Sequence, residues 1–225
     1  MIEGFHRPRT IEDALQLKEK FQDEALYLAG GTEINSLDFP LSPTQLISLE
    51  GLGLTEIKQN GEELLMGACC TMQQALESTV VYSSFQAAIR NVVNRNIRNI
   101  ATIGGHLALN KSCGDLLPVL VVLEAEVTLR TLQEERKVKV EDYVQGDNKG
   151  IVVSFHITRP RNNRFIAVAN YTRTASDLSL ISAASALTKD GDKVKDVIIA
   201  VGGIAPSVVR IRAVEEAMEG NNLPS

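Results

Sequence analysis

The sequence is poor in cysteine, histidine and aromatic residues, and it contains no tryptophan. Its three cysteines and three histidines show none of the spacings that hold zinc or iron–sulfur centres, so we expect no metal site in this chain. Three cysteines are also too few for a disulfide framework. We expect Cys69, Cys70 and Cys113 to be small buried or half-buried side chains.

Long apolar runs, a dense basic stripe and a secretion signal are also absent. No apolar run reaches the length of a membrane-spanning helix, so we expect no membrane partner. A net charge of −5 and scattered lysines and arginines argue against a nucleic-acid partner. The N-terminal residues Met1–Phe5 lack the basic-then-apolar profile of a leader peptide. We therefore expect a cytoplasmic protein.

The sequence does contain two glycine pairs, each preceded by apolar residues: Ala29–Thr32 and Thr102–Gly105. Glycine lets backbone N–H groups approach a ligand that a Cβ would hold away, and successive N–H groups form a nest for phosphate oxygens. The adjacent threonine hydroxyls can donate to the same oxygens. For one such loop alone, a plain turn is a better explanation than a phosphate site. Two of them predict a site for the two phosphates of a dinucleotide, where Gly104→Val or Gly105→Val should expel the ligand and leave the fold largely intact.

Hydrophobic periodicity and turn residues divide the chain into three regions of mixed helices and strands. The first has an amphipathic helix over 10–21, capped by Thr10, and strands at 25–29 and 45–49 in a small βαβ-like arrangement. The second is predicted to have helices at 71–77, from 83 onwards and at 116–123, and strands at 63–68, 125–130 and 136–140. The third has predicted strands at 151–157, 165–171, 178–187 and 194–201, a hairpin turn at 189–192 and a closing helix from about 213; the alanines of 178–187 also permit a helix.

Several motifs resemble those of one family. The stretch Thr102–Asn110, followed by Gly114–Pro118, resembles the FAD-binding subunit of molybdenum hydroxylases, which is the flavin module of xanthine dehydrogenase and the medium chain of carbon monoxide dehydrogenase. Leu28–Ile34 is similar to the first phosphate loop of that family, and Phe5–Pro8 and Arg173–Leu178 fit as well. The resemblance implies an α+β fold: a two-subdomain FAD-binding fold (PCMH type) over 1–55 and 56–160, and a C-terminal α+β domain over 161–225 that is shorter than usual.

The resemblance also implies which residues bind FAD. The first loop would wrap the diphosphate, the second would form another backbone cradle, and Asp115 would contact the cofactor. Val92 and Val152 would lie near the flavin ring, and Asn170 stands where the family often has lysine. The implied set is Tyr27, Leu28, Ala29, Gly30, Gly31, Thr32, Glu33, Ile34, Val92, Thr102, Ile103, Gly104, Gly105, His106, Asp115, Val152 and Asn170.

Each of these roles has a simpler alternative. Asp115 precedes a predicted helix and could be its N-cap, and Glu33 could stabilise a turn. Val92 and Val152 could be ordinary core residues. The chain departs from the family at His106, where asparagine is usual, and at Leu109 and Lys111, where small or hydroxyl residues are usual. These departures concern contacts to FAD and leave the expected fold unchanged.

The sequence shows no proton-transfer pair and no nucleophile triad, so we expect no catalytic side chain. The resemblance implies an oxidoreductase subunit that carries electrons through FAD. A molybdenum-cofactor subunit and a [2Fe-2S] subunit would be its partners, and NAD or another molecule would be the acceptor. Two alternatives remain open: a stand-alone flavoenzyme of the same superfamily, and an assembly or scaffold subunit with weakened FAD binding.

Overall fold

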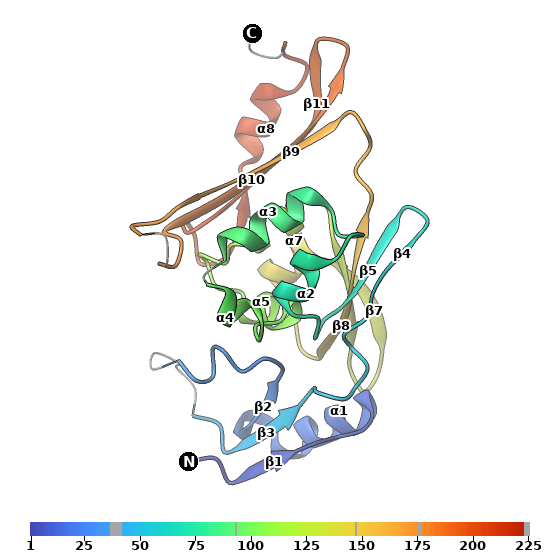
Figure 1. Ribbon diagram of the computed structural model, residues 1–225, viewed down its shortest axis with the longest axis vertical. Coiled ribbons are helices and arrows are strands. Elements are labelled where there is room, and N and C mark those ends of the chain that lie inside the picture. Colours follow the sequence, from blue (N-terminus) through green and yellow to red (C-terminus); the bar gives the residue numbers. More distant parts are fainter. Residues whose placement is uncertain (37–41, 93, 147, 175–176, 223–225) are drawn as a thin grey trace.

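A computed structural model describes residues 1–36, 42–92, 94–146, 148–174 and 177–222. The chain forms three tiers along the long axis of the molecule (Figure 1). The N-terminal tier lies at one end, a larger unit of helices and a five-stranded sheet lies in the middle, and a four-stranded sheet lies at the other end. The mixture of helices and three separate sheets is the expected α+β class.

The N-terminal tier is a small parallel sheet covered by one helix. Its strands β1 (Gly4–His6), β2 (Ala25–Leu28) and β3 (Gln45–Ser48) pair in the order β1-β3-β2. Helix α1 (Ile11–Phe21), followed by the 3-10 turn η1 (Gln22–Glu24), begins as predicted after Thr10, whose hydroxyl accepts the Asp13 N–H. The sequence did not predict β1, which has only three residues.

Within the described residues, the middle tier contains six helices and a five-stranded antiparallel sheet. The strands are β4 (Ile57–Asn60), β5 (Glu63–Gly67), β6 (Glu126–Arg130), β7 (Glu135–Lys139) and β8 (Ile151–Thr158), in the order β4-β5-β8-β6-β7. The helices are α2 (Met72–Glu77), α3 (Ser83–Asn91), α4 (Arg95–Arg98), α5 (Ile103–Leu109), α6 (Leu117–Val122) and α7 (Val140–Gln145). Every residue of α6 is buried, and Pro118 lies in its first turn, where no backbone donor is lost. The described part of the chain has no helix long and apolar enough to cross a membrane.

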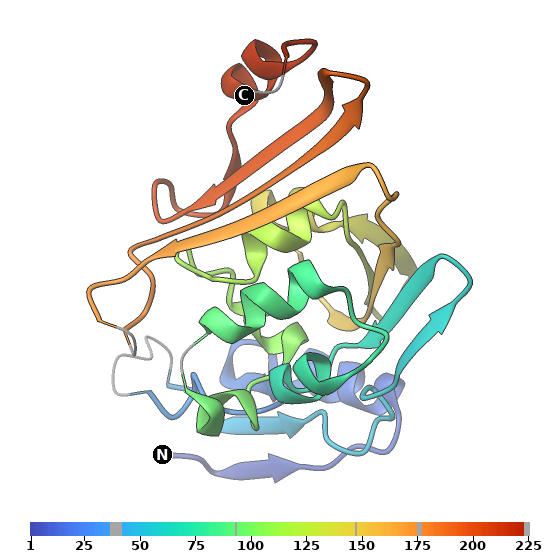
Figure 2. The ribbon, with the colours of Figure 1, turned by 45° about the horizontal axis from the view of Figure 1, so that its top comes forward.

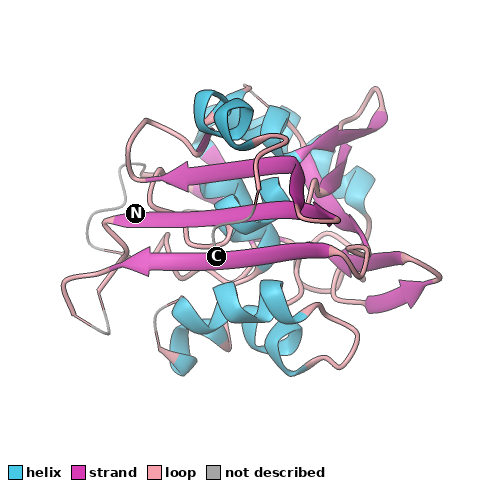
Figure 3. Ribbon diagram, turned by 90° about the horizontal axis from the view of Figure 1, so that it is seen from above, coloured by secondary structure: helices cyan, strands magenta, loops and turns pink. Residues whose placement is uncertain are grey.

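The third tier is an antiparallel sheet that lies across the helices (Figures 2 and 3). Its strands β9 (Arg164–Tyr171), β10 (Ile181–Asp190), β11 (Lys193–Gly202) and β12 (Val209–Arg210) pair in the order β12-β11-β10-β9, and helix α8 (Arg212–Met218) packs on β11. The alanine-rich segment is therefore a strand, and the helical alternative is wrong. Strand pairing on both sides and alternating burial, with Ala184 and Ala186 facing inward, override the helix propensity of alanine.

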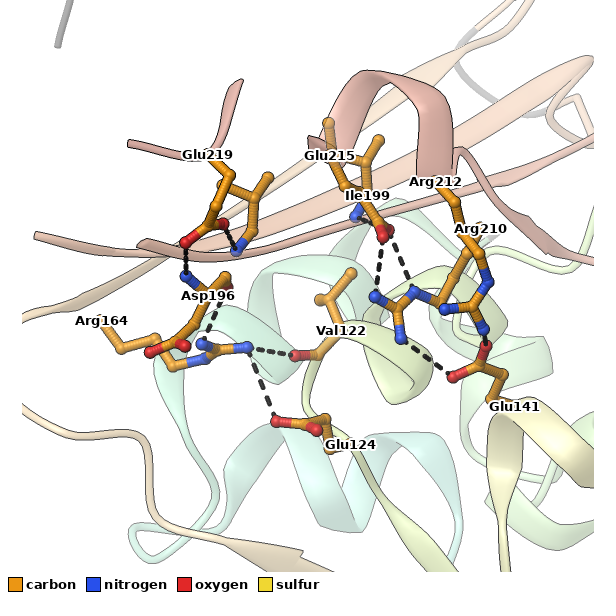
Figure 4. Close-up of polar contacts among 11 residues, drawn as sticks. Val122, Glu124, Glu141, Arg164, Asp196, Ile199, Arg210, Arg212, Glu215 and Glu219 are labelled. Carbon is orange, nitrogen blue, oxygen red and sulfur yellow. Dashed lines mark hydrogen bonds and ion pairs between the residues drawn. The ribbon is translucent and has the colours of Figure 1, made fainter. Parts of the chain in front are cut away.

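Polar contacts join the third tier to the middle one beside α6 (Figure 4). Arg210 lies between Glu215 of α8, at 2.7 Å, and Glu141 of α7, at 3.2 Å. Burial alone would raise the pKa of Glu215, but hydrogen bonds from Arg210 and from the Ile199 N–H, together with the positive charges of Arg210 and Arg212, hold it below its usual value. On the other side of α6, Arg164 donates to the Val122 carbonyl and pairs with Glu124.

Candidate cofactor site

The first glycine pair forms the turn that follows β2. Gly30 lies directly against the segment before α5, since a Cβ at this position would come within 2.0 Å of the Ile100 carbonyl oxygen. Gly31 has φ +70°, a left-handed conformation that favours glycine. Both glycines are therefore required by backbone geometry and by the close approach of two chain segments.

The same turn presents a row of open backbone donors. Its carbonyls at Gly31 and Glu33 accept hydrogen bonds from Asn35 and Ser36. Among the described residues, the five consecutive N–H groups of residues 30–34 have no hydrogen-bond partner, and all five residues are half-buried. Successive unpaired N–H groups around a left-handed residue make a concavity suited to an anion, so this turn can hold a phosphate group.

The second glycine pair is not a loop, as the sequence suggested, but the first turn of α5. Thr102 is the N-cap, and its hydroxyl accepts the Gly105 N–H at 3.0 Å. The Ile103 and Gly104 N–H groups donate to the carbonyls of Cys70 and Ala68. The N–H groups in the first turn of α5 are thus already hydrogen-bonded within the protein. A ligand at this turn would contact Cα atoms and the helix terminus, and it would find no free N–H group among these three.

Gly104 also has a packing role that the sequence did not reveal. A Cβ at this position would come within 2.6 Å of the Ala68 Cβ and within 2.7 Å of the Ala68 carbonyl oxygen. Gly105 is less confined, because its Cβ would meet only the Thr102 hydroxyl oxygen, at 2.8 Å. The expectation that a side chain at Gly104 would leave the fold intact therefore needs correction: glycine is needed there by the protein itself.

The two glycine segments lie side by side although they are far apart in the sequence. Gly30 contacts Ile100 and Ala101, which immediately precede the Thr102 cap. Glu33 forms an ion pair with Lys111, which follows α5. These contacts bring the open donors of residues 30–34 next to the C-terminal end of α5.

His106, on α5, links this region to the turn before α6. Its Nε2 atom accepts the Leu116 N–H at 3.3 Å. Loss of solvent around the imidazole, with a smaller effect of the Lys111 charge, lowers the pKa of His106 to about 4. His106 is therefore neutral near pH 7, with Nε2 as an acceptor, and it serves to fix the turn at 112–116.

Asp115 is the centre of a buried polar network that joins the middle and third tiers. Its Oδ1 atom accepts hydrogen bonds from Asn170 of β9 and from the Ser179 hydroxyl, and Asn170 accepts one from Asn91 at the end of α3. Burial raises the pKa of Asp115, and the two hydrogen bonds partly offset this rise. The alternative role as an N-cap is not seen, since the N-cap of α6 is Leu116 and the helix has no side-chain cap.

A cavity of about 580 Å³ lies beside this network. It is bounded by the segment after Lys111 on one side and by the segment before β10 on the other. An ion pair between Arg173 and Asp177, at 3.3 Å, forms part of its wall. The lining residues are Ser112, Cys113, Arg173, Asp177, Leu178, Ser179, Leu180 and Gly203.

Other predicted site residues are buried in hydrophobic clusters. Val92 is the C-cap of α3 and Val152 lies on β8, and both are buried in the main core together with Ile103. Tyr27 packs with the N-terminal cluster, where burial raises the pKa of its hydroxyl. Sequence reasoning missed Asn91 and Ser179, which hold Asp115 and Asn170, and it gave Lys111 no role in the site. No local pattern marks these residues, because their partners are remote in the sequence.

Comparisons with known proteins agree with this architecture. Residues 1–160 match the family described as "FAD binding domain in molybdopterin dehydrogenase", and residues 167–225 match "CO dehydrogenase flavoprotein C-terminal domain". The uncharacterized protein YgfM of Escherichia coli (strain K12) is 32% identical over 224 residues, which cover 99% of this chain and 83% of that protein. The nicotine 6-hydroxylase medium subunit of Paenarthrobacter nicotinovorans is 25% identical, over 96% of this chain and 80% of its own length.

A solved structure has the same fold. The carbon monoxide dehydrogenase of Hydrogenophaga pseudoflava, in a form that lacks the Mo-pyranopterin moiety, superimposes with a TM-score of 0.93 over 100% of this chain and 83% of that one, at 22% identity. The chain thus belongs to the family of FAD-binding flavoprotein subunits of molybdopterin dehydrogenases. It is an oxidoreductase subunit, and its cofactor is FAD.

The residues present fit that cofactor. The open N–H groups of residues 30–34 can hold a diphosphate, and the half-buried turn excludes part of the competing water. The cavity lined by Ser112 and Ser179 is large enough for a sizeable part of a dinucleotide and lies next to the Asp115 network. No group of three metal-binding side chains occurs within the described ranges.

Proposed function

We propose that this chain is the FAD-carrying electron-transfer subunit of a cytoplasmic molybdenum hydroxylase complex. The open donors of residues 30–34, which lie beside Lys111, carry this proposal together with the cavity that begins at Ser112. Its partners are a molybdenum-cofactor subunit and a [2Fe-2S] subunit. The sequence supports a separate iron–sulfur chain, since its three cysteines are fewer than the four ligands of a typical cluster.

The protein's part in this function is to bind and orient the cofactor. FAD, when bound, supplies the redox chemistry, and the acceptor is NAD or another molecule. Backbone groups from Tyr27 to Ile34 hold the diphosphate. The α5 terminus, Thr102 to His106, supports the same region, and Asp115 with Asn170 holds polar groups of the cofactor. Val92 and Val152 pack behind the flavin.

We propose that each of the three tiers contributes a separate part of the FAD site. Residues 1–55 carry the diphosphate turn, residues 56–160 carry α5 and the Asp115 turn, and residues 161–225 close the cavity from the far side. The ligand would then lie where all three units meet, which is a common position for a cofactor site.

Flavin binding by the purified chain tests the proposal. After incubation with FAD and removal of free cofactor, we expect a yellow protein with flavin absorption bands in the visible spectrum. Gly31→Val should lose the bands, since it places a branched side chain at φ +70° in the diphosphate turn. A control variant, Gly191→Val, carries the same strain (φ +61°) at the remote β10–β11 turn and should retain flavin. A colourless wild-type protein would refute the proposal.

An assembly subunit with weakened FAD binding is the second candidate. Its supporting observation is that Asp115 Oδ1 already accepts two hydrogen bonds within the protein, which leaves this atom less available to a ligand. The two candidates differ in FAD affinity, measured by quenching of flavin fluorescence. Co-purification of a molybdenum subunit with a chain that binds FAD only weakly would favour the second, and it would argue against a stand-alone flavoenzyme.

A further inference from the structure

Lys111 brings a positive charge to the edge of the turn with open N–H groups. It follows α5, and its ammonium group contacts the Glu33 carboxylate. Glu33 lies within the row of open N–H groups at residues 30–34. One member of this ion pair therefore belongs to the anion-binding turn, and the other comes from the segment that leads into the cavity.

The Glu33 carboxylate by itself would oppose phosphate binding at this turn. A carboxylate within an anion-binding turn repels a phosphate, at a separation where Coulomb energies are appreciable even in a solvated site. Lys111 compensates that charge. Its side chain is 44% exposed whereas that of Glu33 is 23% exposed, so the ammonium group is the more accessible member of the pair. A lysine ammonium has three donors, and one carboxylate does not use them all.

We infer that Lys111 is a phosphate-binding residue whose ammonium group the Glu33 carboxylate holds in an ion pair that competes with the phosphate contact. This inference rests on the proposed function, because it assigns a side-chain cation to the diphosphate that the backbone of residues 30–34 holds. A point charge on a flexible stem is a common partner of phosphate.

Substitutions of Lys111 and of Glu33 should change the affinity for FAD in opposite directions. Lys111→Met removes the cation and leaves Glu33 uncompensated, so we expect the dissociation constant for FAD to rise by about tenfold. Glu33→Gln frees the cation and removes a repelling charge, so the dissociation constant should fall by about threefold. An ion pair that only braces the turn would give weaker binding in both variants.

Riboflavin separates a phosphate contact from a general disturbance of the site, because it has the same ring and no phosphate. We expect Lys111→Met to change the riboflavin dissociation constant by less than about twofold. The loss of FAD affinity should also diminish as ionic strength rises. A matched control is the pair of Lys58 and Glu56, at 2.9 Å near β4, which lies far from the turn in Figure 1. Lys58→Met and Glu56→Gln change the net charge equally and should leave FAD binding unchanged.

All variants would be titrated with FAD and with riboflavin by flavin fluorescence, after thermal melts have established that they are folded. An unchanged FAD dissociation constant in Lys111→Met would overturn the inference and leave the proposed function standing. Equal weakening of FAD and riboflavin binding in both Lys111→Met and Glu33→Gln would also overturn it, in favour of a bracing role. Absence of FAD binding in the wild-type chain would refute the proposed function and the inference together.

Discussion

Replacing Gly104 by alanine tests whether the second glycine pair is needed for folding rather than for the ligand. The added Cβ would lie 2.6 Å from the Ala68 Cβ and 2.7 Å from its carbonyl oxygen, whereas ordinary contacts begin at 3.4 Å. Ala68 is held in place, because its N–H donates to the Val153 carbonyl at 2.9 Å and its carbonyl accepts the Gly104 N–H at 2.8 Å. Relief therefore requires movement of α5 or of the chain after β5.

Two effects of opposite sign determine how far Gly104→Ala changes the free energy of unfolding. Overpacking of this kind costs about 1–3 kcal/mol. Alanine gains at most about 1 kcal/mol over glycine in a helix, and less in a first turn. We expect the free energy of unfolding to fall by about 1–2 kcal/mol, which corresponds to a melting temperature lower by roughly 2–8 °C for a protein of this size.

The assay is urea or thermal unfolding followed by far-UV circular dichroism, without FAD, since a bound ligand would add its own stabilisation. Gly105→Ala is the matched control, because it lies one residue further along the helix and would meet only the Thr102 hydroxyl oxygen, with no backbone atom in the way. We expect its stability to change by less than about 1 kcal/mol. A Gly104→Ala protein as stable as the wild type, or an equal loss in both variants, would refute the packing argument.

Three further changes probe other parts of the structure. Arg210→Met should lower the free energy of unfolding by about 2 kcal/mol in urea titrations, because it leaves a buried carboxylate unpaired; an unchanged midpoint would contradict this. The pKa of His106, lowered from 6.5 to about 4, means that the unfolded chain binds a proton more readily, so stability should fall as the pH drops through this window, and His106→Asn should reduce the slope. Burial raises the pKa of Cys69 to about 11 and of Cys70 to about 12, so in a Cys113→Ser background Ellman's reagent at pH 8 should react rapidly only after unfolding.

Local signals in the sequence predicted many elements correctly. The Thr10 cap and the apolar face after it correctly predicted α1, and the turn residues at 189–192 correctly predicted the hairpin of β10 and β11. The predicted strands at 125–130 and 136–140 are found as β6 and β7. These features depend on residues that are close in the sequence, where propensity and periodicity act directly.

Features that depend on remote contacts could not be predicted. The donors of α5 are taken by the carbonyls of Ala68 and Cys70, and no pattern near Gly104 indicates this. The partners of Asp115 come from α3, β9 and the segment before β10. The two glycine segments do lie side by side, but the rest of the fold determines whether their N–H groups are open or bonded.

The complete burial of α6 limits how the protein can be divided. Its six residues, Leu117–Val122, pack against β10 and β11 on one side and against α3 and α7 on others. Cleavage near residue 160, or expression of the first 160 residues alone, would strip the sheet from this helix and expose a continuous apolar surface. Such a fragment should aggregate or be degraded, so mapping by truncation would report on solubility and not on FAD binding. Point substitutions in the intact chain are the informative route.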